Sequence, residues 1–335
     1  MQQPLVSILI PFKNTEEFLT ECMVSVLGQD YTNWEVIAVN DSSSDQSEAI
    51  LNVFANKDPR IKVLSNEGDG IIHALRTAYS KANGTLVTRM DSDDIMFSDR
   101  LGTMVRSLVD KGRKHLAVGQ VKYFSEQGIS NGYARYEHWL NKLTESGTNY
   151  TEIYKECVIP SPCWMIHKKD LDLCGAFDSN RYPEDYDLTF RFYQHGMTCI
   201  PCDKTLHQWR DYSKRTSRTS EHYAQNYFLD IKLHYFLKLD HDQNRPLCIW
   251  GAGSKGKTIA KKLTVLKIDF IWVCDNPNKI GKFIYGVKLQ HFNAIREYPN
   301  MQGIITVANE EAQVMIRSYL NKLGKVVLKD FYFFC

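Results

Sequence analysis

The side chains with the clearest capacity for chemistry are the acidic ones at residues 91–94, which read Asp-Ser-Asp-Asp. They follow an apolar segment that is typical of a buried strand, residues 85–90. Carboxylates two residues apart on a chain leaving a sheet can face one pocket and hold a hard divalent cation through their oxygens. Such a cation neutralises a diphosphate and makes it a better leaving group. The alternative is an acidic turn or helix cap, since aspartate is common before helices.

The elements that must position this cluster alternate along the first hundred residues. Strands are predicted at residues 5–10, 34–39, 61–64 and 85–90, and helices at 16–27, 45–55 and 70–82. This alternation predicts an α/β fold with helices covering a mostly parallel sheet. In such sheets ligands collect beyond the carboxyl ends of the strands. Pro11, Asp41 and the 91–94 cluster all lie at those ends, so we expect them at one edge.

The pattern loosens after residue 100 and then starts again. A long amphipathic helix, about 221–239, leads into a polar stretch at 240–245, beyond which a new strand begins at Leu247. The sequence therefore predicts a first domain at 1–220, a helical linker at 221–245 and a second domain at 246–335.

The second domain opens with a strand, a G-x-G-x-x-G turn and a helix start, with glycines at 251, 253 and 256. Asp275 ends the next predicted strand, 24 residues after Gly251. In this context, Gly251, Gly253 and Gly256 let the backbone approach a pyrophosphate, and the acidic side chain reaches a ribose. We predict a small Rossmann-like domain that corresponds to a mononucleotide-binding half, too short for redox catalysis. Binding of a nucleotide for ligand sensing, dimerisation into a homo-oligomer, acceptor docking and packing alone stay open.

Four motifs, in order, resemble those of glycosyltransferase family 2, whose members have the GT-A fold. They are residues 6–14, 39–45, 89–95 and 183–188. The resemblance covers residues 5 to about 220. It implies a metal-dependent enzyme that transfers a sugar from a nucleotide-diphosphate donor, with UDP favoured, to an acceptor hydroxyl.

The resemblance also assigns a donor-binding role to the loops after the first two strands. Asp41 would bind the base or ribose, beside the backbone of Pro11, Phe12 and Asn14. The family often has tyrosine where this chain has Lys13. Stacking on the base therefore falls to Phe12 or is lost.

Metal binding and catalysis are implied for the two later motifs. Asp91 and Asp93 would hold the ribose and a Mn or Mg ion, with Asp93 as the direct ligand. Asp185 would be the general base that deprotonates the acceptor in a single inverting displacement, with Glu184 in support. The alternative for the pair Glu184 and Asp185 is a helix N-terminus, which favours anions through its dipole.

The chain departs from the family near residue 210. Many relatives place a metal-binding histidine where this chain has Tyr212, so His207 becomes the substitute candidate for the third protein ligand. Arg210, Arg215 and Arg218 either clamp the diphosphate with forked hydrogen bonds or lie in a solvated loop.

Charge and cysteine content bear on compartment and partners. Nine cysteines without a paired framework, no secretory signal and no apolar run of 18 residues predict a cytoplasmic protein with reduced thiols. The net charge is +2, but residues 246–335 carry 11 Lys and 2 Arg against 3 Asp and 3 Glu, a surplus of +7 that leaves −5 for residues 1–245. A basic tail meets a polyanion or is simply well solvated.

Three functions follow as alternatives. The first is an inverting transferase acting on a saccharide or lipid-linked glycan in surface-polysaccharide assembly. The second, from a looser resemblance to the queuosine-tRNA glycosyltransferases of family 2, is a tRNA-modifying transferase whose basic tail contacts the backbone. The third is a nucleotide-binding regulatory protein with a dead transferase domain, against which the intact Asp93 and Asp185 argue.

Overall fold

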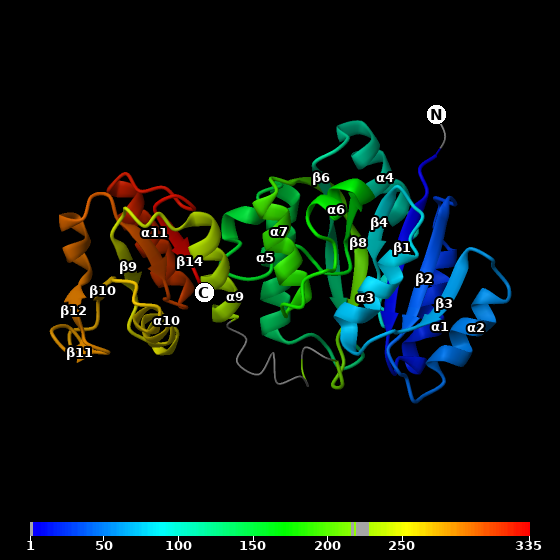
Figure 1. Ribbon diagram of the computed structural model, residues 1–335, viewed down its shortest axis with the longest axis horizontal. Helices are drawn as coiled ribbons and strands as arrows, with labels where there is room; N and C mark the ends of the chain where they lie inside the picture. Colours follow the sequence, from blue (N-terminus) through cyan, green and yellow to red (C-terminus); the bar gives the residue numbers. More distant parts are fainter. Residues whose placement is uncertain (1–2, 216–217, 219–227) are drawn as a thin grey trace. The chain divides into compact units, whose positions relative to one another are not determined.

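The computed structural model describes residues 3–215, 218 and 228–335 (Figure 1). Contacts divide the chain into two compact units: the first holds Met1–Tyr150 and Cys157–Thr219, and the second holds Thr151–Glu156 and Ser220–Cys335. Residues 221–227 of the predicted linker helix lie outside the described residues. Beyond them, α9 (Leu229–Tyr235) and a π-helix (Phe236–Asp240) belong to the second unit. Among the described helices, none has the length and apolar character needed to span a bilayer.

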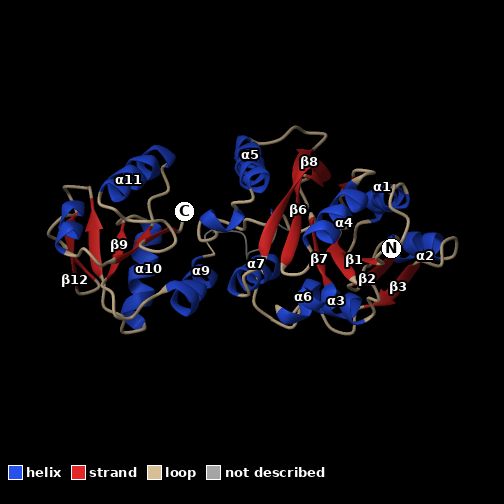
Figure 2. Ribbon diagram, turned by 90° about the horizontal axis from the view of Figure 1, so that it is seen from above, coloured by secondary structure: helices blue, strands red, loops and turns tan. Residues whose placement is uncertain are grey.

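The first unit is an eight-stranded sheet with helices on both faces (Figure 2). In sheet order its strands are β3 (Ile61–Ser65), β2 (Trp34–Asn40), β1 (Val6–Phe12), β4 (Leu86–Arg89), β7 (Trp164–His167), β6 (His115–Phe124), β8 (Thr198–Arg210) and β5 (Ile95–Met96). The helices on one face are α1 (Glu16–Leu27), α4 (Arg100–Lys111) and α5 (Asn131–Ser146). Those on the other are α3 (Gly70–Ser80), α6 (Lys168–Leu173) and α7 (Glu184–Gln194), while α2 (Ser47–Ala55) packs near β3.

The α/β prediction is confirmed, and the sheet is mixed beyond its first four strands. β3, β2, β1 and β4 are parallel. β7 runs antiparallel to both β4 and β6, β8 runs parallel to β6, and β5 pairs antiparallel with β8. The carboxyl ends of β1, β2 and β4 therefore share one edge, as the sequence predicts.

β1 shows how the sequence shapes that edge. All seven of its residues are buried, because the strand lies in the middle of the sheet with helices over both faces. Its ladder with β4 ends at Leu9, which pairs with Arg89, whereas its ladder with β2 continues to Phe12. Pro11 has no N–H to donate, and it lies beyond the paired part of β4. The chain after β4 is thus released from the sheet at residue 91.

The second unit is more complete than the predicted mononucleotide half. In sheet order its strands are β11 (Phe283–Ile284), β12 (Val287–His291), β10 (Ile271–Cys274), β9 (Leu247–Trp250), β13 (Gln302–Ile305) and β14 (Phe331–Phe333). Apart from the short antiparallel β11, the strands are parallel and follow the order 3-2-1-4-5. This is five strands of the Rossmann order. The short connections, α10 (Ser254–Val265), the 3₁₀ segment Phe292–Glu297 and α11 (Glu310–Lys322), explain how so few residues suffice.

A six-residue excursion from the first unit, Thr151–Glu156, is part of the second unit. The ring of Tyr154 stacks on Phe334 with centroids 5.3 Å apart and meets Tyr332 edge-on at 5.5 Å. Its hydroxyl donates to Asp240 at 2.5 Å. The sequence predicts that this segment belongs to the first domain, because nothing local marks it as different from its neighbours.

We expect the substitution Gly256→Ala to unfold the second unit more easily. A methyl group at Gly256 would lie 2.1 Å from the carbonyl oxygen of Gly251, a backbone atom that cannot move aside cheaply. The expected loss of unfolding free energy is about 2–3 kcal/mol. Gly253→Ala is the matched control, since a Cβ there meets nothing within 4 Å, and it should cost less than about 1 kcal/mol. Chemical denaturation of both variants measures the difference, and equal midpoints would contradict the expected clash.

Candidate active site

Asp41, just after β2, is held in a fixed orientation by three donors. Asn66 Nδ2 donates to its Oδ1 at 2.6 Å, the N–H of Gly70 donates to the same oxygen at 2.9 Å, and Lys13 Nζ approaches Oδ2 at 3.2 Å. Burial raises the pKa of Asp41, but these hydrogen bonds outweigh it and bring the pKa below its ordinary value. Asp41 is therefore a pre-oriented carboxylate beside a half-exposed lysine.

The loops after β1 and β2 are tied together. Asn14, at a positive φ of 53°, accepts from the N–H of Ser44 at 2.8 Å and donates its own N–H to Ser43 Oγ at 3.1 Å. Phe12 is only 2% exposed and packs in the core. Its ring is thus unavailable for stacking on a base. The backbone around Pro11 and Phe12 lies beside Asp41, whose N–H donates to the Phe12 carbonyl at 2.9 Å.

The buried guanidinium of Arg89, at the end of β4, joins two of the predicted motifs. Its Nε donates to Asp91 at 2.8 Å and its Nη1 donates to Glu184 at 2.9 Å. Asp91 begins the 91–94 loop, and Glu184 begins α7. The two acidic segments, 93 residues apart in sequence, therefore lie on either side of one cation.

Asp93 points away from this bridge toward the end of β8. The Tyr212 hydroxyl donates to its Oδ2 at 3.0 Å, and Arg210 Nε donates to its backbone carbonyl at 2.7 Å. Burial raises the pKa of Asp93 to about 7, and the charges of Asp94 and Asp91 add to the shift. Tyr212, at the position where the resemblance to the family implies a histidine, thus contacts the predicted metal ligand.

The chemistry of this donor set fits a hard divalent cation. Three carboxylates within four residues leave an excess of negative charge that raises the pKa of Asp93, and a cation would relieve it. Within the described ranges, no three His, Cys, Asp or Glu side chains converge on one point.

His207 lies beneath the loop instead of facing it. It is fully buried on β8, its Nε2 is 2.9 Å from Asp94 Oδ2, and its Nδ1 is 2.9 Å from Arg100 Nη1. Arginine can only donate, so Nδ1 must accept and Nε2 must carry the proton that is donated to Asp94. Burial lowers the pKa of His207 well below its ordinary value, and the Arg100 charge adds to this. The imidazole is thus neutral, and both of its ring nitrogens have hydrogen-bond partners within the protein.

The same chain of hydrogen bonds holds Asp94. Its other oxygen accepts the N–H of Arg210 at 2.8 Å. Burial raises the pKa of Asp94, and the charge of Asp91 adds to the shift. N–H donors nevertheless contact both of its oxygens, which is the arrangement expected for an ionised carboxylate. Arg100 also donates to Thr88 Oγ1 at 3.0 Å and to the Pro162 carbonyl.

The three arginines proposed as a diphosphate clamp have partners within the protein. Arg210 lies between the rings of Phe18 and Phe124, at 4.6 and 4.5 Å, and pairs with Glu21. The guanidinium of Arg215 is 4.9 Å from the Trp209 ring centroid. Arg218 makes a bidentate pair with Asp211 at 2.7 and 2.6 Å, which is a third arrangement that neither alternative anticipated.

Asp185 lies in the first turn of α7, next to Glu184. One of its oxygens accepts its neighbour's N–H, that of Tyr186, at 2.7 Å, and no described residue donates to the other oxygen. Burial raises the pKa of Asp185 to about 7 and the Glu184 charge adds to the shift, whereas Arg89 opposes it. A carboxyl with this pKa and one open oxygen has the properties of a general base that works near neutral pH.

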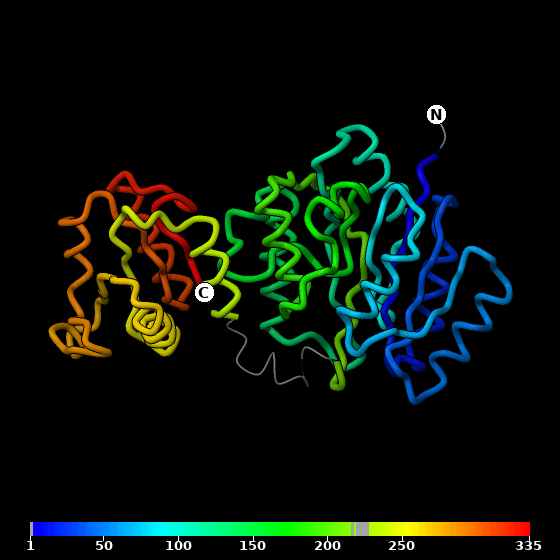
Figure 3. Tube along the Cα trace, viewed as in Figure 1, coloured from blue at the N-terminus to red at the C-terminus, as the bar shows by residue number. Residues whose placement is uncertain are grey.

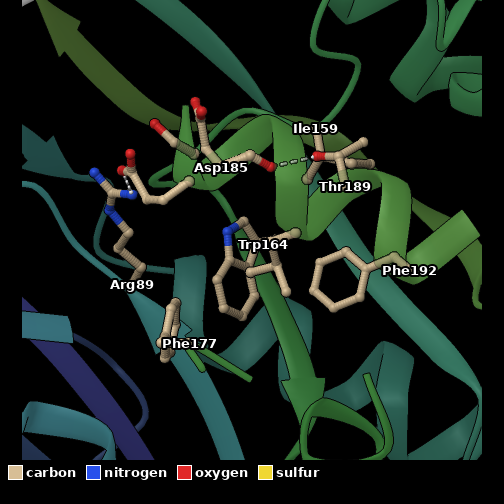
Figure 4. Close-up of a pocket in the computed structure, with 10 residues that line it drawn as sticks. Arg89, Ile159, Trp164, Phe177, Asp185, Thr189 and Phe192 are labelled. Carbon is tan, nitrogen blue, oxygen red and sulfur yellow. Dashed lines mark hydrogen bonds and ion pairs between the residues drawn. The ribbon is translucent and has the colours of Figure 1, made fainter. Parts of the chain in front are cut away.

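A small pocket opens beside Asp185 (Figure 4). Arg89, Glu184 and Asp185 form its polar side. Its other walls are made of Ile159, Ser161, Trp164, Phe177, Leu188, Thr189 and Phe192. The pocket thus combines the candidate base with an aromatic floor.

The glycine turn of the second unit lies at the carboxyl end of β9, between β10 and β13, where the strand order reverses. Gly251 has a φ of 122°, Gly256 packs on its carbonyl, and space is open around Gly253. Lys279 Nζ donates to the Ala252 carbonyl at 2.7 Å, and Asp275, just past β10, is exposed. This is the switch-point position at which such folds bind ligands. Nucleotide binding here stays a prediction.

The α/β sheet of the first unit and its carboxylate edge define a glycosyltransferase of the GT-A class. A family model described as "Glycosyl transferase family 2" matches residues 7–174. The chain belongs to glycosyltransferase family 2.

Curated relatives agree with the family. The glycosyltransferase GlyG of Streptococcus pneumoniae is 36% identical over 222 residues, which are 64% of this chain and 73% of GlyG. GlyA of the same organism is 27% identical over 211 residues, which are 61% of this chain but only 30% of GlyA. The Escherichia coli UDP-Glc:alpha-D-GlcNAc-diphosphoundecaprenol beta-1,3-glucosyltransferase WfgD is 31% identical over 175 residues, 51% of this chain and 68% of WfgD.

Solved structures share the fold. Residues 1–349 of Staphylococcus aureus TarS in complex with UDP-GlcNAc superpose with a TM-score of 0.53 at 18% identity, and the match covers 71% of this chain and 68% of that TarS chain. The mannosyltransferase PcManGT from Pyrobaculum calidifontis, in complex with GDP-Man and Mn²⁺, gives a TM-score of 0.53 at 18% identity and covers 71% of each chain. At this identity the likeness establishes the GT-A fold that the sequence predicts.

Several residues of the site escaped the sequence analysis. In the sequence Arg89 is only the first residue of a motif, and its bridge between Asp91 and Glu184 depends on residues that are distant in sequence. Arg100 is fully buried on α4, although arginine is usually exposed. Trp164 lies in an apolar segment, residues 164–166, whose pattern alone does not indicate that a side chain lines a pocket.

We expect His207→Leu to destabilise the first unit by about 3 kcal/mol. The substitution leaves Asp94 and Arg100 buried without their shared partner, and an uncompensated buried charge is costly. Chemical denaturation measures the loss. The control is His138→Leu on the exposed face of α5, which should stay within about 0.5 kcal/mol of the wild type. A His207 variant as stable as the control would contradict the hydrogen-bonded chain.

Proposed function

We propose that the chain is an inverting, metal-dependent glycosyltransferase that moves a sugar from a nucleotide-diphosphate donor to a hydroxyl of a saccharide or lipid-linked glycan. One observation carries the proposal: Arg89 contacts both Asp91 of the diphosphate-binding motif and Glu184 beside the candidate base. With Asp185 as the base, the group that leaves the donor and the carboxylate that takes the acceptor's proton would lie at one site.

The donor would lie along the edge of the sheet. Asp41 presents a carboxylate oxygen to the base or ribose, and a base with a ring N–H, such as uracil, is a suitable partner for it. Asp91 and Asp93 would hold the ribose and the cation. When bound, the divalent cation neutralises the diphosphate and improves it as a leaving group. Tyr212 orients Asp93 through its hydroxyl, and Arg210 holds the backbone of the same loop.

Asp185 would complete the reaction from the other side of the sugar. Its open oxygen would take the proton of the acceptor hydroxyl as that oxygen attacks the anomeric carbon. Arg89 fixes Glu184 and so positions the first turn of α7. A single displacement of this kind inverts the anomeric configuration, and the name of the relative WfgD specifies a beta product.

The acceptor class is proposed from the relatives. WfgD acts on a sugar linked to diphosphoundecaprenol, as its name states, and this favours a role in polysaccharide assembly. tRNA, the alternative acceptor, is separated by a binding assay over a salt series. Binding of bulk tRNA that weakens steeply with salt would favour tRNA, because Lys and Arg contacts to phosphates release counterions.

We expect Asp185→Asn to lower transfer at least a hundredfold while leaving the fold intact, because general-base catalysis contributes about that much or more. Release of nucleoside diphosphate from UDP-glucose, UDP-galactose, UDP-N-acetylglucosamine and GDP-mannose, with and without Mn²⁺, measures the effect. Asp187→Asn on the same helix is unsuitable as a control because Asp187 is buried in ion pairs. Asp178→Asn, on the exposed loop before α7, is the matched control. Unchanged turnover in the Asp185 variant would refute the assignment of the base.

The pH dependence follows from the same carboxyl. A general base is active when deprotonated, so kcat/KM should rise with pH up to an apparent pKa near 7 and level off above it. The profile is measured between pH 5.5 and 8.5 with circular dichroism to show that the protein stays folded. A profile that is flat through this range would exclude a base with a raised pKa.

A further inference from the structure

Trp164 presents an unused hydrogen-bond donor to the pocket beside Asp185. The residue is 3% exposed on β7, and its ring meets Phe192 edge-on with centroids 5.9 Å apart. Its indole Nε1 has no hydrogen-bond partner among the described residues, although the side chain lines the pocket. Figure 4 shows the nitrogen edge of the indole turned toward the side where Arg89 and Asp185 lie. Because this N–H is open to the pocket and no described residue accepts from it, it can donate to a ligand that enters there.

Ser161 adds a second polar group to the same pocket. It is 8% exposed and lies in the turn before β7 that is closed by a hydrogen bond from the Cys163 N–H to the Pro160 carbonyl at 3.0 Å. Its hydroxyl likewise has no partner within the described part of the chain. The pocket therefore offers an N–H donor and a hydroxyl between apolar walls.

Arg89 shows which part of a substrate would enter. It lines the pocket and pairs with Asp91 on one side and Glu184 on the other. In a single displacement the anomeric carbon lies between the leaving phosphate and the hydroxyl activated by the base. The ring that carries this carbon must therefore adjoin the pocket.

We propose that Trp164, through its indole N–H and with Ser161, binds a ring hydroxyl of the transferred sugar and so helps to determine which donor sugar the enzyme accepts. The inference rests on the proposed function. The pocket is small, so a single ring hydroxyl of a pyranose would enter it and meet these polar groups, between apolar walls that include Phe177 and Leu188. A site built to bond one hydroxyl discriminates strongly against an analogue that lacks it, since the buried polar group is then left unpaired.

The test is a comparison of donor analogues in wild type and Trp164→Phe. The variant keeps an aromatic ring and loses only the N–H donor and one ring. Donor hydrolysis is measured for the most active of the four donors named above and for its deoxy-sugar analogues. Wild type should disfavour one analogue by about tenfold or more in kcat/KM, and in Trp164→Phe this ratio should fall to about twofold or less. A purely structural role would lower kcat/KM for all donors alike.

Two further variants make the comparison decisive. Trp34→Phe, the same change at another buried tryptophan on β2, should keep the wild-type ratio. Ser161→Ala should reduce the ratio for the same or the adjacent hydroxyl, and it tests the pocket should Trp164→Phe fold poorly. Wild-type discrimination in both pocket variants would overturn the proposal.

Nuclear magnetic resonance separates the donor sugar from other ligands. The chain has six tryptophans, so ¹⁵N-indole spectra are simple, and Trp164→Phe identifies the signal. We expect the Trp164 N–H signal to move with the sugar nucleotide and to stay in place with UDP alone. Movement with UDP alone, or with the acceptor alone, would reject a donor-sugar subsite. An active Asp185→Asn enzyme would instead reject the proposed function, independently of the result at Trp164.

Discussion

The structure depends on crowded carboxylates held in place by cations that are themselves buried. Asp91, Asp93, Asp94, Glu184 and Asp185 occupy one edge of the first sheet. Arg89 bridges two of them, and Arg100 acts on Asp94 through His207. Such groups are costly to bury unless each is paired. The hydrogen-bonded partners offset that cost, and the proposed divalent cation would neutralise the negative charge that remains.

Much of this arrangement could be predicted from the sequence because it follows from local pattern. The apolar run that forms β1 and the acidic residues that follow β2 and β4 determine an edge with carboxylates on it. The order of the motifs then indicated the family and its GT-A fold, which the comparisons confirm. The glycine turn likewise predicted a Rossmann-like second unit from only ten residues.

The rest depends on neighbours that are distant in sequence. The sequence makes His207 a candidate metal ligand because it lies close to Tyr212 along the chain. On β8, however, its side chain faces the buried side of the sheet, where Asp94 and Arg100 contact both ring nitrogens. Phe12 was a candidate for base stacking, and strand alternation buries its ring as well. The completeness of the second sheet also depends on long-range pairing of short strands, which carry little periodicity of their own.

The excursion at Thr151–Glu156 means that the two units are interleaved in sequence. A chain cut after residue 219 would carry Tyr154 and Ile153 without the aromatic cluster of Phe236, Tyr332 and Phe334 that surrounds the tyrosine. Those apolar surfaces would face water, and the remaining fragment would be prone to aggregate. The transferase unit is therefore poorly suited to transfer into another protein as a simple N-terminal module. A chimera must keep the segment Thr151–Glu156 together with the second unit to which it belongs.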